Sequence, residues 1–273
     1  MLEQEKDATA ALERAEVEAC RSYTSAASPA VAAELGLAHR PIGSALAVAA
    51  AEVDILAYNR VLALGVETPA TEAELEEAVE FFRAMGVPRC MAHVAPGALP
   101  ARLEAWLGAR GFVRHNHWLK LCRDLSDLPR EPATPRTART GAEHAEAFAR
   151  TEVEAFGHAE RLTPWIAGTV GRPGWHHFAT FDGADPIGFG ALFVSGRAAW
   201  LGFASTRASH RRRGVQSALI AARLRAAAAL SCELAVVETA DDMPEKPNPS
   251  THNLMRMGFR IAYRRPNWVL KFA

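Results

Sequence analysis

The sequence predicts an α/β (α+β) protein made of two halves that share one order of helices and strands. Its 273 residues, 49% of them hydrophobic, are enough to bury the cores of two domains of ordinary size. A segment with three prolines, residues 127–137 (DLPREPATPRT), divides the chain almost in half and disfavours both helix and continuous strand. Helical and strand-like apolar patterns recur in a similar order on its two sides.

The order is clearest in the C-terminal half. Helical spacing covers residues 141–156 and 215–230, and the turn signals Asp182-Gly183 and Ser195-Gly196 separate strands. Asn248 resembles an N-cap followed by Pro249, and Gly258 closes that helix. The predicted strands are 136–139, 176–181, 186–194, 198–205, 234–238, 259–263 and 268–272, and a second short helix is expected near 162–170.

The N-terminal half repeats this order more faintly. We predict helices at 10–20, 72–85 and 100–110, and strands near 45–49, 53–57, 61–66, 90–94 and 112–121. The two halves also end alike, in LGARGFVRHNHWLKL and LMRMGFRIAYRRPNWVLKF, each a helix end, Gly-Phe and a strand with Trp. We interpret this as a duplication, with domains 1–126 and 138–273 joined by the linker 127–137.

Charge is balanced overall but not between the halves. From Arg136 onward there are 18 Lys and Arg against 12 Asp and Glu, while residues 1–135 hold the other 13 and 19. The balances of +6 and −6 would attract an anionic ligand to the C-terminal half, and would also attract the halves to each other. The net charge of zero gives no reason to expect a nucleic-acid or membrane partner.

Cysteine and terminal patterns indicate a cytoplasmic protein. The four cysteines, Cys20, Cys90, Cys122 and Cys232, are scattered without a CxxC pair, which argues against a zinc site and a disulfide framework. The start, MLEQEKDATAALERAE, is too acidic and polar for a signal peptide. The longest apolar run, residues 42–51, is too short to span a bilayer.

The segment that carries chemistry is AWLGFASTRASHRRRGVQSALIAARLRAAA. A predicted strand leads through the basic loop 207–214 into a helix that begins near Val215. The first turn of a helix offers free backbone N–H groups and the positive end of its dipole, and Gly214 has no side chain to keep a ligand away from them. Together these features predict a pyrophosphate site.

The motif Arg211-x-x-Gly214-x-Gln216 resembles the Q/R-x-x-G-x-G/A signature of the GNAT superfamily of acyl-CoA-dependent N-acetyltransferases. The resemblance implies two tandem domains, each a mixed, mostly antiparallel sheet flanked by helices, with acetyl-CoA as co-substrate. Gln216 departs from the signature, so its side chain must point away from the phosphates. By the resemblance, the cofactor-binding residues are Phe203, Ala204, Ser205 and Thr206 on the strand, Arg211, Arg212, Arg213, Gly214, Val215, Gln216 and Ser217 at the loop, and Asn248 and Ser250 beside the CoA arm.

The N-terminal half has no such loop. Glu67, Glu72 and Glu74 stand where phosphates would have to bind. Thr71 and Glu74 have the spacing of a capping box, which would satisfy the helix N-terminus with its own side chains. We therefore expect a degenerate GNAT-like domain without a CoA site.

For acid–base chemistry the sequence offers Glu238 and His252. Glu238 ends an apolar strand beside the predicted cleft and is the first candidate for the base, although an exposed strand-end carboxylate is the simpler interpretation. Leu254 stands where many GNAT enzymes carry the Tyr that protonates the leaving thiolate. His252 lies two residues upstream, where a surface role competes with that of an acid.

These observations predict transfer of an acetyl group from acetyl-CoA to a primary amine of a small-molecule or amino-acid-like acceptor, by direct attack in a ternary complex. A non-catalytic acyl-CoA sensor or assembly module is the alternative. A nucleic-acid binder using Arg211, Arg212 and Arg213 is a third hypothesis, but it lacks interleaved aromatic residues. The acceptor pocket is expected around residues 151–170 and 263–268. Nothing in the sequence decides between a monomer and a homodimer.

Overall fold

The described strands form one continuous eleven-stranded sheet. The structure is a computed structural model that describes residues 2–130, 135–245 and 247–272; part of the expected linker therefore lies outside the described residues. The strands are β1 (Leu37–Ile42), β2 (Ala45–Ala50), β3 (Arg60–Leu62), β4 (Arg89–His93), β5 (Val113–Asp124), β6 (Arg136–Thr140), β7 (Trp175–Asp182), β8 (Asp185–Ser195), β9 (Ala198–Thr206), β10 (Leu234–Ala240) and β11 (Arg260–Lys271). Their order is β1-β2-β3-β4-β11-β5-β10-β9-β8-β7-β6.

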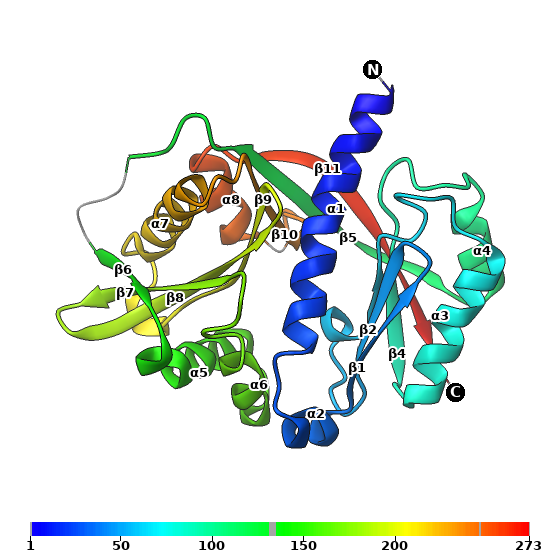
Figure 1. Ribbon diagram of the computed structural model, residues 1–273, viewed down its shortest axis with the longest axis horizontal. Helices are drawn as coiled ribbons and strands as arrows, with labels where there is room; N and C mark the ends of the chain where they lie inside the picture. Colours follow the sequence, from blue (N-terminus) through cyan, green and yellow to red (C-terminus); the bar gives the residue numbers. More distant parts are fainter. Residues whose placement is uncertain (1, 131–134, 246, 273) are drawn as a thin grey trace.

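The two halves exchange their last strands at the centre of this sheet. β11 lies between β4 and β5, and β5 lies between β11 and β10 (Figure 1). Each half contains one parallel pair, β3 with β4 in the N-terminal half and β9 with β10 in the C-terminal half. In the sheet, the last strand of the other half lies next to each pair: β11 beside β4, and β5 beside β10. The predicted separate strands 259–263 and 268–272 are wrong, because β11 runs unbroken over twelve residues with two register shifts against β5.

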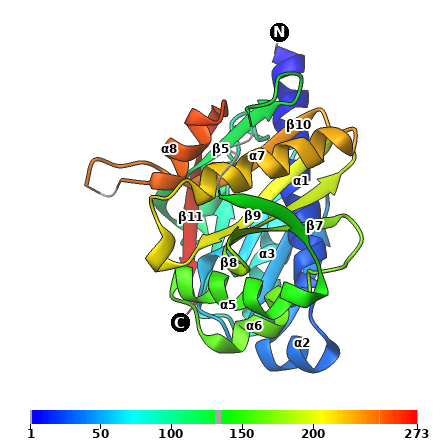
Figure 2. The same cartoon turned by 90° about the vertical axis from the view of Figure 1, so that its left-hand side faces the viewer.

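Helices cover both faces of the sheet. They are α1 (Leu2–Thr24), α2 (Pro29–Leu35), α3 (Glu72–Met85), α4 (Leu103–Ala109), α5 (Ala145–Phe156), α6 (Thr163–Ala167), α7 (Val215–Ala229) and α8 (Pro249–Arg256). Along β9, Trp200 faces the core of α1, α5 and α6, whereas Ala199 and Leu201 face the core of α7 and α8. Figure 2 shows β8 and β9 between α7 and the pair α5 and α6.

Local signals account for most of these elements. The predicted N-cap and first-turn proline of α8, Asn248 and Pro249, are confirmed. Helix α2 was not predicted, although Ser28 caps it, Pro29 begins it and Gly36 ends it in the left-handed conformation. The strand predicted at 53–57 is wrong, because the Asn59 amide bonds Val53 O and Ala50 N and turns the chain into the short helix η1 (Leu56–Tyr58).

α1 crosses the centre of the sheet and packs against strands of both halves (Figure 1). The helix predicted at residues 10–20 is present but longer, because α1 extends over Leu2–Thr24. None of the helices in the described part of the chain is long and apolar enough to cross a membrane. All four cysteines are free and buried, and the described residues hold no group of three or more ligating side chains suited to a metal ion.

Candidate functional site

The sheet opens between β9 and β10. These parallel strands pair only where Ala198–Trp200 lies beside Leu234–Val236. Beyond that point β9 continues to Thr206 and β10 to Ala240, each paired only on its outer side, with β8 and β5 respectively. Residues 201–206 and 237–240 therefore present backbone edges without a strand partner, which an extended ligand can use.

A β-bulge marks the start of this open edge. The register of β8 and β9 shifts between the pairs Phe189–Ser205 and Ala191–Gly202, and Phe203 has a positive φ of 48°. Gly202 is required here, because a Cβ atom would lie 1.9 Å from the Trp200 ring. A bulge beside an open strand edge re-aims backbone groups, as is common next to active sites.

Arg223 supports the bulge from α7. Its side chain is buried, and Nη1 donates to Ala191 O at 3.2 Å and to Gly202 O at 3.3 Å. Burial lowers the pKa of this guanidinium to about 10, against the effect of the Glu152 carboxylate. Arg223 was not predicted as a site residue, since an Arg inside an Ala-rich helix gives no local signal that it will be buried.

The loop after β9 ends at an open helix N-terminus. Arg212 and Gly214 have positive φ values of 63° and 79°, and Gly214 is the N-cap of α7 without any side-chain cap bond. The first backbone N–H groups of the fifteen-residue α7 thus have no capping side chain. A Cβ at Gly214 would meet only Pro135 Cδ at 3.9 Å, so the backbone can be approached closely. Arg211, Arg212 and Arg213 are exposed around it.

The side chains around the loop leave this end of α7 uncovered. Gln216 Nε2 donates to Thr206 Oγ1 at 2.9 Å, so its side chain turns back to the end of β9. Arg213 and His210 lie 3.5 Å from the Asp182 carboxylate. The motif residues are therefore compatible with an anion at the helix N-terminus.

The corresponding region of the N-terminal half is closed. The predicted capping box of α3 is present: Glu74 N donates to Thr71 Oγ1 at 3.2 Å, and Thr71 N donates to Glu74 Oε2 at 2.7 Å. Leu99 fills the space between the end of β3 and the start of α3. Its N–H donates to Gly65 O and its carbonyl accepts from Ala70 N, both at 2.8 Å.

Glu238 lies in the opening but is fully engaged. Both carboxylate oxygens accept from Trp200 Nε1, at 3.0 and 2.9 Å, and Oε2 is 3.6 Å from Lys120 Nζ. Burial and the nearby Glu16 raise the pKa of Glu238. The residue is thus not the exposed strand-end carboxylate of the simpler interpretation; it belongs to a buried ionic cluster.

This ionic cluster joins the two halves beneath α1. Its three acidic and three basic residues are Glu13, Glu16, Glu238, Arg60, Lys120 and Arg265. Burial opposes ionisation of Glu16, but Arg265, Lys120 and Arg60 together hold its pKa well below the usual value. Because the charges balance and interlock, the cluster fixes α1, β3, β5, β10 and β11 relative to one another.

The residues predicted on α8 lie at its start and on its surface. His252 is 57% exposed in its side chain and lies 3.1 Å from the Asp242 carboxylate. The Asn248 amide caps Ser250 N and donates to Thr239 Oγ1 and Ala240 O, so its polar atoms hold α8 to the end of β10. Ser250 is exposed. Leu254 is buried in the core beneath α7.

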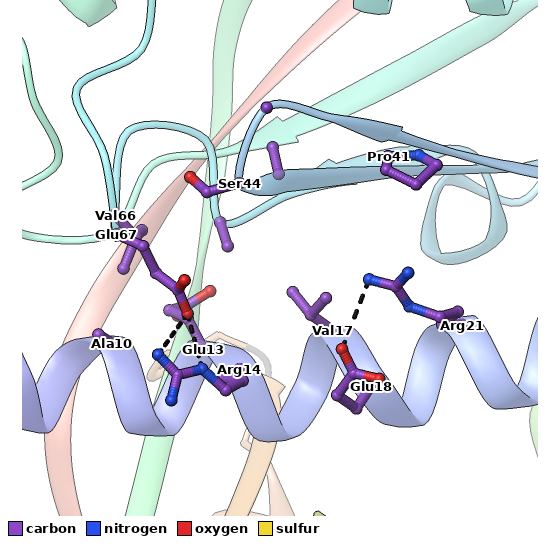
Figure 3. Close-up of a pocket in the computed structure, with 13 residues that line it drawn as sticks. Ala10, Glu13, Arg14, Val17, Glu18, Arg21, Pro41, Ser44, Val66 and Glu67 are labelled. Carbon is purple, nitrogen blue, oxygen red and sulfur yellow. Dashed lines mark hydrogen bonds and ion pairs between the residues drawn. The ribbon is translucent and has the colours of Figure 1, made fainter.

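A separate cavity of about 220 Å³ lies in the N-terminal half, between α1, the turn from β1 to β2 and the segment after β3 (Figure 3). Its charged side chains pair with one another. Arg14 lies 2.6 Å from Glu67, and Arg21 lies 3.4 Å from Glu18. The buried Glu13 lines it and is bonded to Tyr263 and Arg265.

Solved structures share this architecture. A GCN5-related N-acetyltransferase from Kribbella flavida matches with a TM-score of 0.63 and 19% identity, over 89% of this chain and 95% of that one. A GCN5-related N-acetyltransferase from Sphaerobacter thermophilus matches at 0.59 and 13%, over 83% and 80%. The chain has the GNAT fold. The fold class predicted from the sequence is therefore confirmed.

The duplicated form of this fold is also represented. A tandem GNAT protein from the clavulanic acid biosynthesis pathway matches with a TM-score of 0.55 and 20% identity, over 73% of this chain and 69% of that one. No family model matches the chain, and no curated protein matches it. At these identities the GNAT neighbours establish the fold alone.

Proposed function

We propose that the chain is an acetyl-CoA-dependent N-acetyltransferase whose single cofactor site lies in the C-terminal half. One observation carries the proposal: the open strand edge of β9 leads directly into the uncapped N-terminus of α7 at Gly214. An acyl-CoA has matching chemistry, an extended amide-bearing arm joined to a pyrophosphate. The N-acetyltransferases with the same fold support this choice.

In the proposed complex the pyrophosphate lies on the backbone N–H groups of residues 212–217, near the guanidinium of Arg211. The pantetheine arm adds to the β9 edge at residues 203–206, and the thioester lies near the bulge at Phe203. Ser250 is free to contact the arm, whereas the Asn248 side chain holds the end of β10 in place. This arrangement leaves the bulge backbone to orient the carbonyl for attack.

The proposed reaction is direct attack of a neutral amine on the thioester carbon. Leu254 is buried and apolar, and His252 is exposed and paired with Asp242, so neither provides an acid inside the opening. A thiolate has an ordinary pKa of about 8.5, so it can leave as the anion and take a proton from water or from the product ammonium.

An acyl-CoA sensor is the second candidate function. It is favoured by one observation: both residues predicted for acid–base chemistry, Glu238 and His252, are engaged by other side chains. A sensor would bind acetyl-CoA without releasing its thiol to any amine.

The test combines calorimetry with acetyl-CoA and a thiol-release assay over a panel of amines and amino acids. We expect one acetyl-CoA per chain and thiol release with at least one primary amine. Binding without thiol release over the whole panel would favour the sensor. Absence of acetyl-CoA binding to folded protein would overturn the proposed function.

A further inference from the structure

A buried carboxyl on the same face of the sheet as α1 has no role so far. Glu152 on α5 is 5% exposed and is directed at β9, next to Ser205. Its Oε2 has no hydrogen-bond partner among the described residues. The hydroxyl groups of Ser205 and Tyr23, in residues 2% and 7% exposed, make no hydrogen bond of good geometry there, although Ser205 lies beside the Glu152 carboxyl and Tyr23 beside the Tyr58 phenol.

Such unpartnered groups are costly to bury. A polar atom taken out of water without a hydrogen bond loses its interactions with water and gains none in return, and a carboxylate loses more than a neutral group. Glu152 of α5 lies beside Ser205 of β9, and Tyr23 of α1 is near enough for the carboxylate to act on its phenol. These groups adjoin the bulge at Phe203, where the thioester would lie. The convergence indicates a site for a polar ligand rather than a packing defect.

The charged surroundings leave Glu152 available to a cation. Arg223 from α7 acts on it, but this guanidinium is directed at the carbonyls of Ala191 and Gly202. Burial raises the pKa of the Tyr23 and Tyr58 phenols, and the Glu152 carboxylate nearby raises both further. Burial lowers the pKa of His177, on β7 behind Phe148, to about 4, so this imidazole is neutral at pH 7. Burial raises the pKa of Glu152 itself to about 7.

Aromatic rings of the core pack beside these groups. Tyr23 stacks on Trp165 with ring centroids 4.2 Å apart and meets Phe203 edge-on at 4.8 Å. Tyr58 lies 5.0 Å from Trp165. Faces of electron-rich rings beside a carboxylate favour an organic cation over a neutral or anionic ligand.

We propose that Glu152, Ser205 and Tyr23 bind the ammonium group of the acceptor, a primary amine carried on an apolar body, and that Glu152 takes the proton which frees the amine. This rests on the proposed function. It also gives the N-terminal half a direct part in the site through Tyr23 of α1.

The proton balance is simple. The Glu152 carboxylate takes one proton from the bound ammonium and becomes neutral. The amine nitrogen then forms a bond to the thioester carbon, the C–S bond breaks, and its electron pair leaves on the CoA sulfur. The second nitrogen proton goes to that thiolate, which gives an amide and a thiol. Glu152 returns its proton to solvent before the next cycle.

The experiment measures amine binding without turnover. Propylammonium, hexylammonium and 2-phenylethylammonium are titrated calorimetrically into the full chain, with and without CoA, at pH 6 and pH 8. Variants are Glu152→Gln, Tyr23→Phe and the matched control Glu154→Gln, an exposed carboxyl of the same helix. The neutral isostere 2-phenylethanol controls for apolar binding, and a thermal melt confirms that each variant is folded.

We expect at least one ammonium to bind the wild-type chain about tenfold more tightly at pH 8 than at pH 6, following ionisation of Glu152. Glu152→Gln should weaken binding at pH 8 by tenfold or more and remove its pH dependence, while Glu154→Gln matches wild type. No binding of any of the three ammonium ions, or equal binding by folded Glu152→Gln, overturns the proposal.

The measurements of acetyl-CoA binding, thiol release and ammonium binding also test this subsite separately from the proposed function. If acetyl-CoA does not bind but an ammonium binds through Glu152, the transferase is wrong and the cation site stands. If acetyl-CoA binds and thiol is released while Glu152→Gln leaves amine binding unchanged, the transferase stands and this subsite is wrong.

Discussion

The N-termini of α7 and α3 occupy corresponding places in the two halves but differ in chemistry. α7 begins at Gly214, in the left-handed conformation and without a side-chain cap. α3 begins at Thr71, whose hydroxyl and backbone are both bonded to Glu74. An uncapped terminus keeps its N–H groups for an anion, whereas a capping box uses them. A duplicated fold can therefore keep an anion site in one half and lose it in the other by changes at a few residues.

The strands that precede these helices, β3 and β9, also differ in whether the space beside their ends is filled. Both parallel pairs are followed by a residue of positive φ, Ala63 at 58° and Phe203 at 48°. After Ala63 the backbone of Leu99 bonds Gly65 and Ala70 and fills the space. After Phe203 the edge of β9 toward β10 has no strand partner. The N-terminal half thus makes with its own chain the contacts that we propose acetyl-CoA makes in the C-terminal half.

The largest effect is expected from removing one half. A fragment of residues 136–273 lacks α1 and β5, so β10 loses its antiparallel neighbour and Glu238 loses Lys120. Breaking one partner out of a buried ionic group alone costs about 3–5 kcal/mol, a large share of the stability of a domain. We expect no cooperative unfolding transition by circular dichroism. A soluble, folded and fully active fragment would refute the structural role of the N-terminal half.

The next largest effect concerns the open helix terminus. Gly214→Val should weaken acetyl-CoA binding about a hundredfold or more, because a β-branched residue strains a φ of 79° and covers the backbone. Gly86→Val is the matched control, since Gly86 has a φ of 71° and open space around its Cα. It should cost similar stability without changing affinity. Calorimetry that finds equal affinities for both folded variants would contradict the comparison.

Glu152 gives a prediction on pH and stability. Burial raises its pKa from 4.5 to about 7, so between these values the folded chain holds a proton that the unfolded chain releases. Its contribution to the free energy of unfolding therefore falls as pH rises through this window. From pH 5 to pH 8 the free energy of unfolding of Glu152→Gln should therefore rise relative to that of wild type by about 2.5 kcal/mol. Urea unfolding with Glu154→Gln as control measures this; an equal difference at both pH values would contradict it.

The smallest effect is expected at the closed terminus. Thr71→Ala removes the cap of α3 and should lower the free energy of unfolding by about 1 kcal/mol. Acetyl-CoA stoichiometry should stay at one per chain, because Leu99 still fills the space beside that helix. A second bound acetyl-CoA in this variant would show that the cap alone had closed the N-terminal site.

Sequence reasoning was most accurate where the signal is local. The capping box of α3, the cap and proline of α8 and the glycine before α7 each depend on residues within one helical turn. It was least accurate at the exchanged strands, because the pairing of β11 with β4 and β5 joins residues far apart along the chain. Neither 259–263 nor 268–272 carries a signal that the two runs form one strand.

The sequence by itself therefore determined the GNAT fold class and the duplication. It also determined that α7 begins without a side-chain cap whereas α3 begins with a capping box. Only the tertiary structure decided that Glu238 accepts from Trp200 and pairs with Lys120, that Arg223 supports the bulge, and that Tyr23 of α1 comes near Glu152 of α5. The physical reason is the range of the forces. Caps and turns act over three or four residues, whereas burial and ionic pairing act between any groups that the fold brings together.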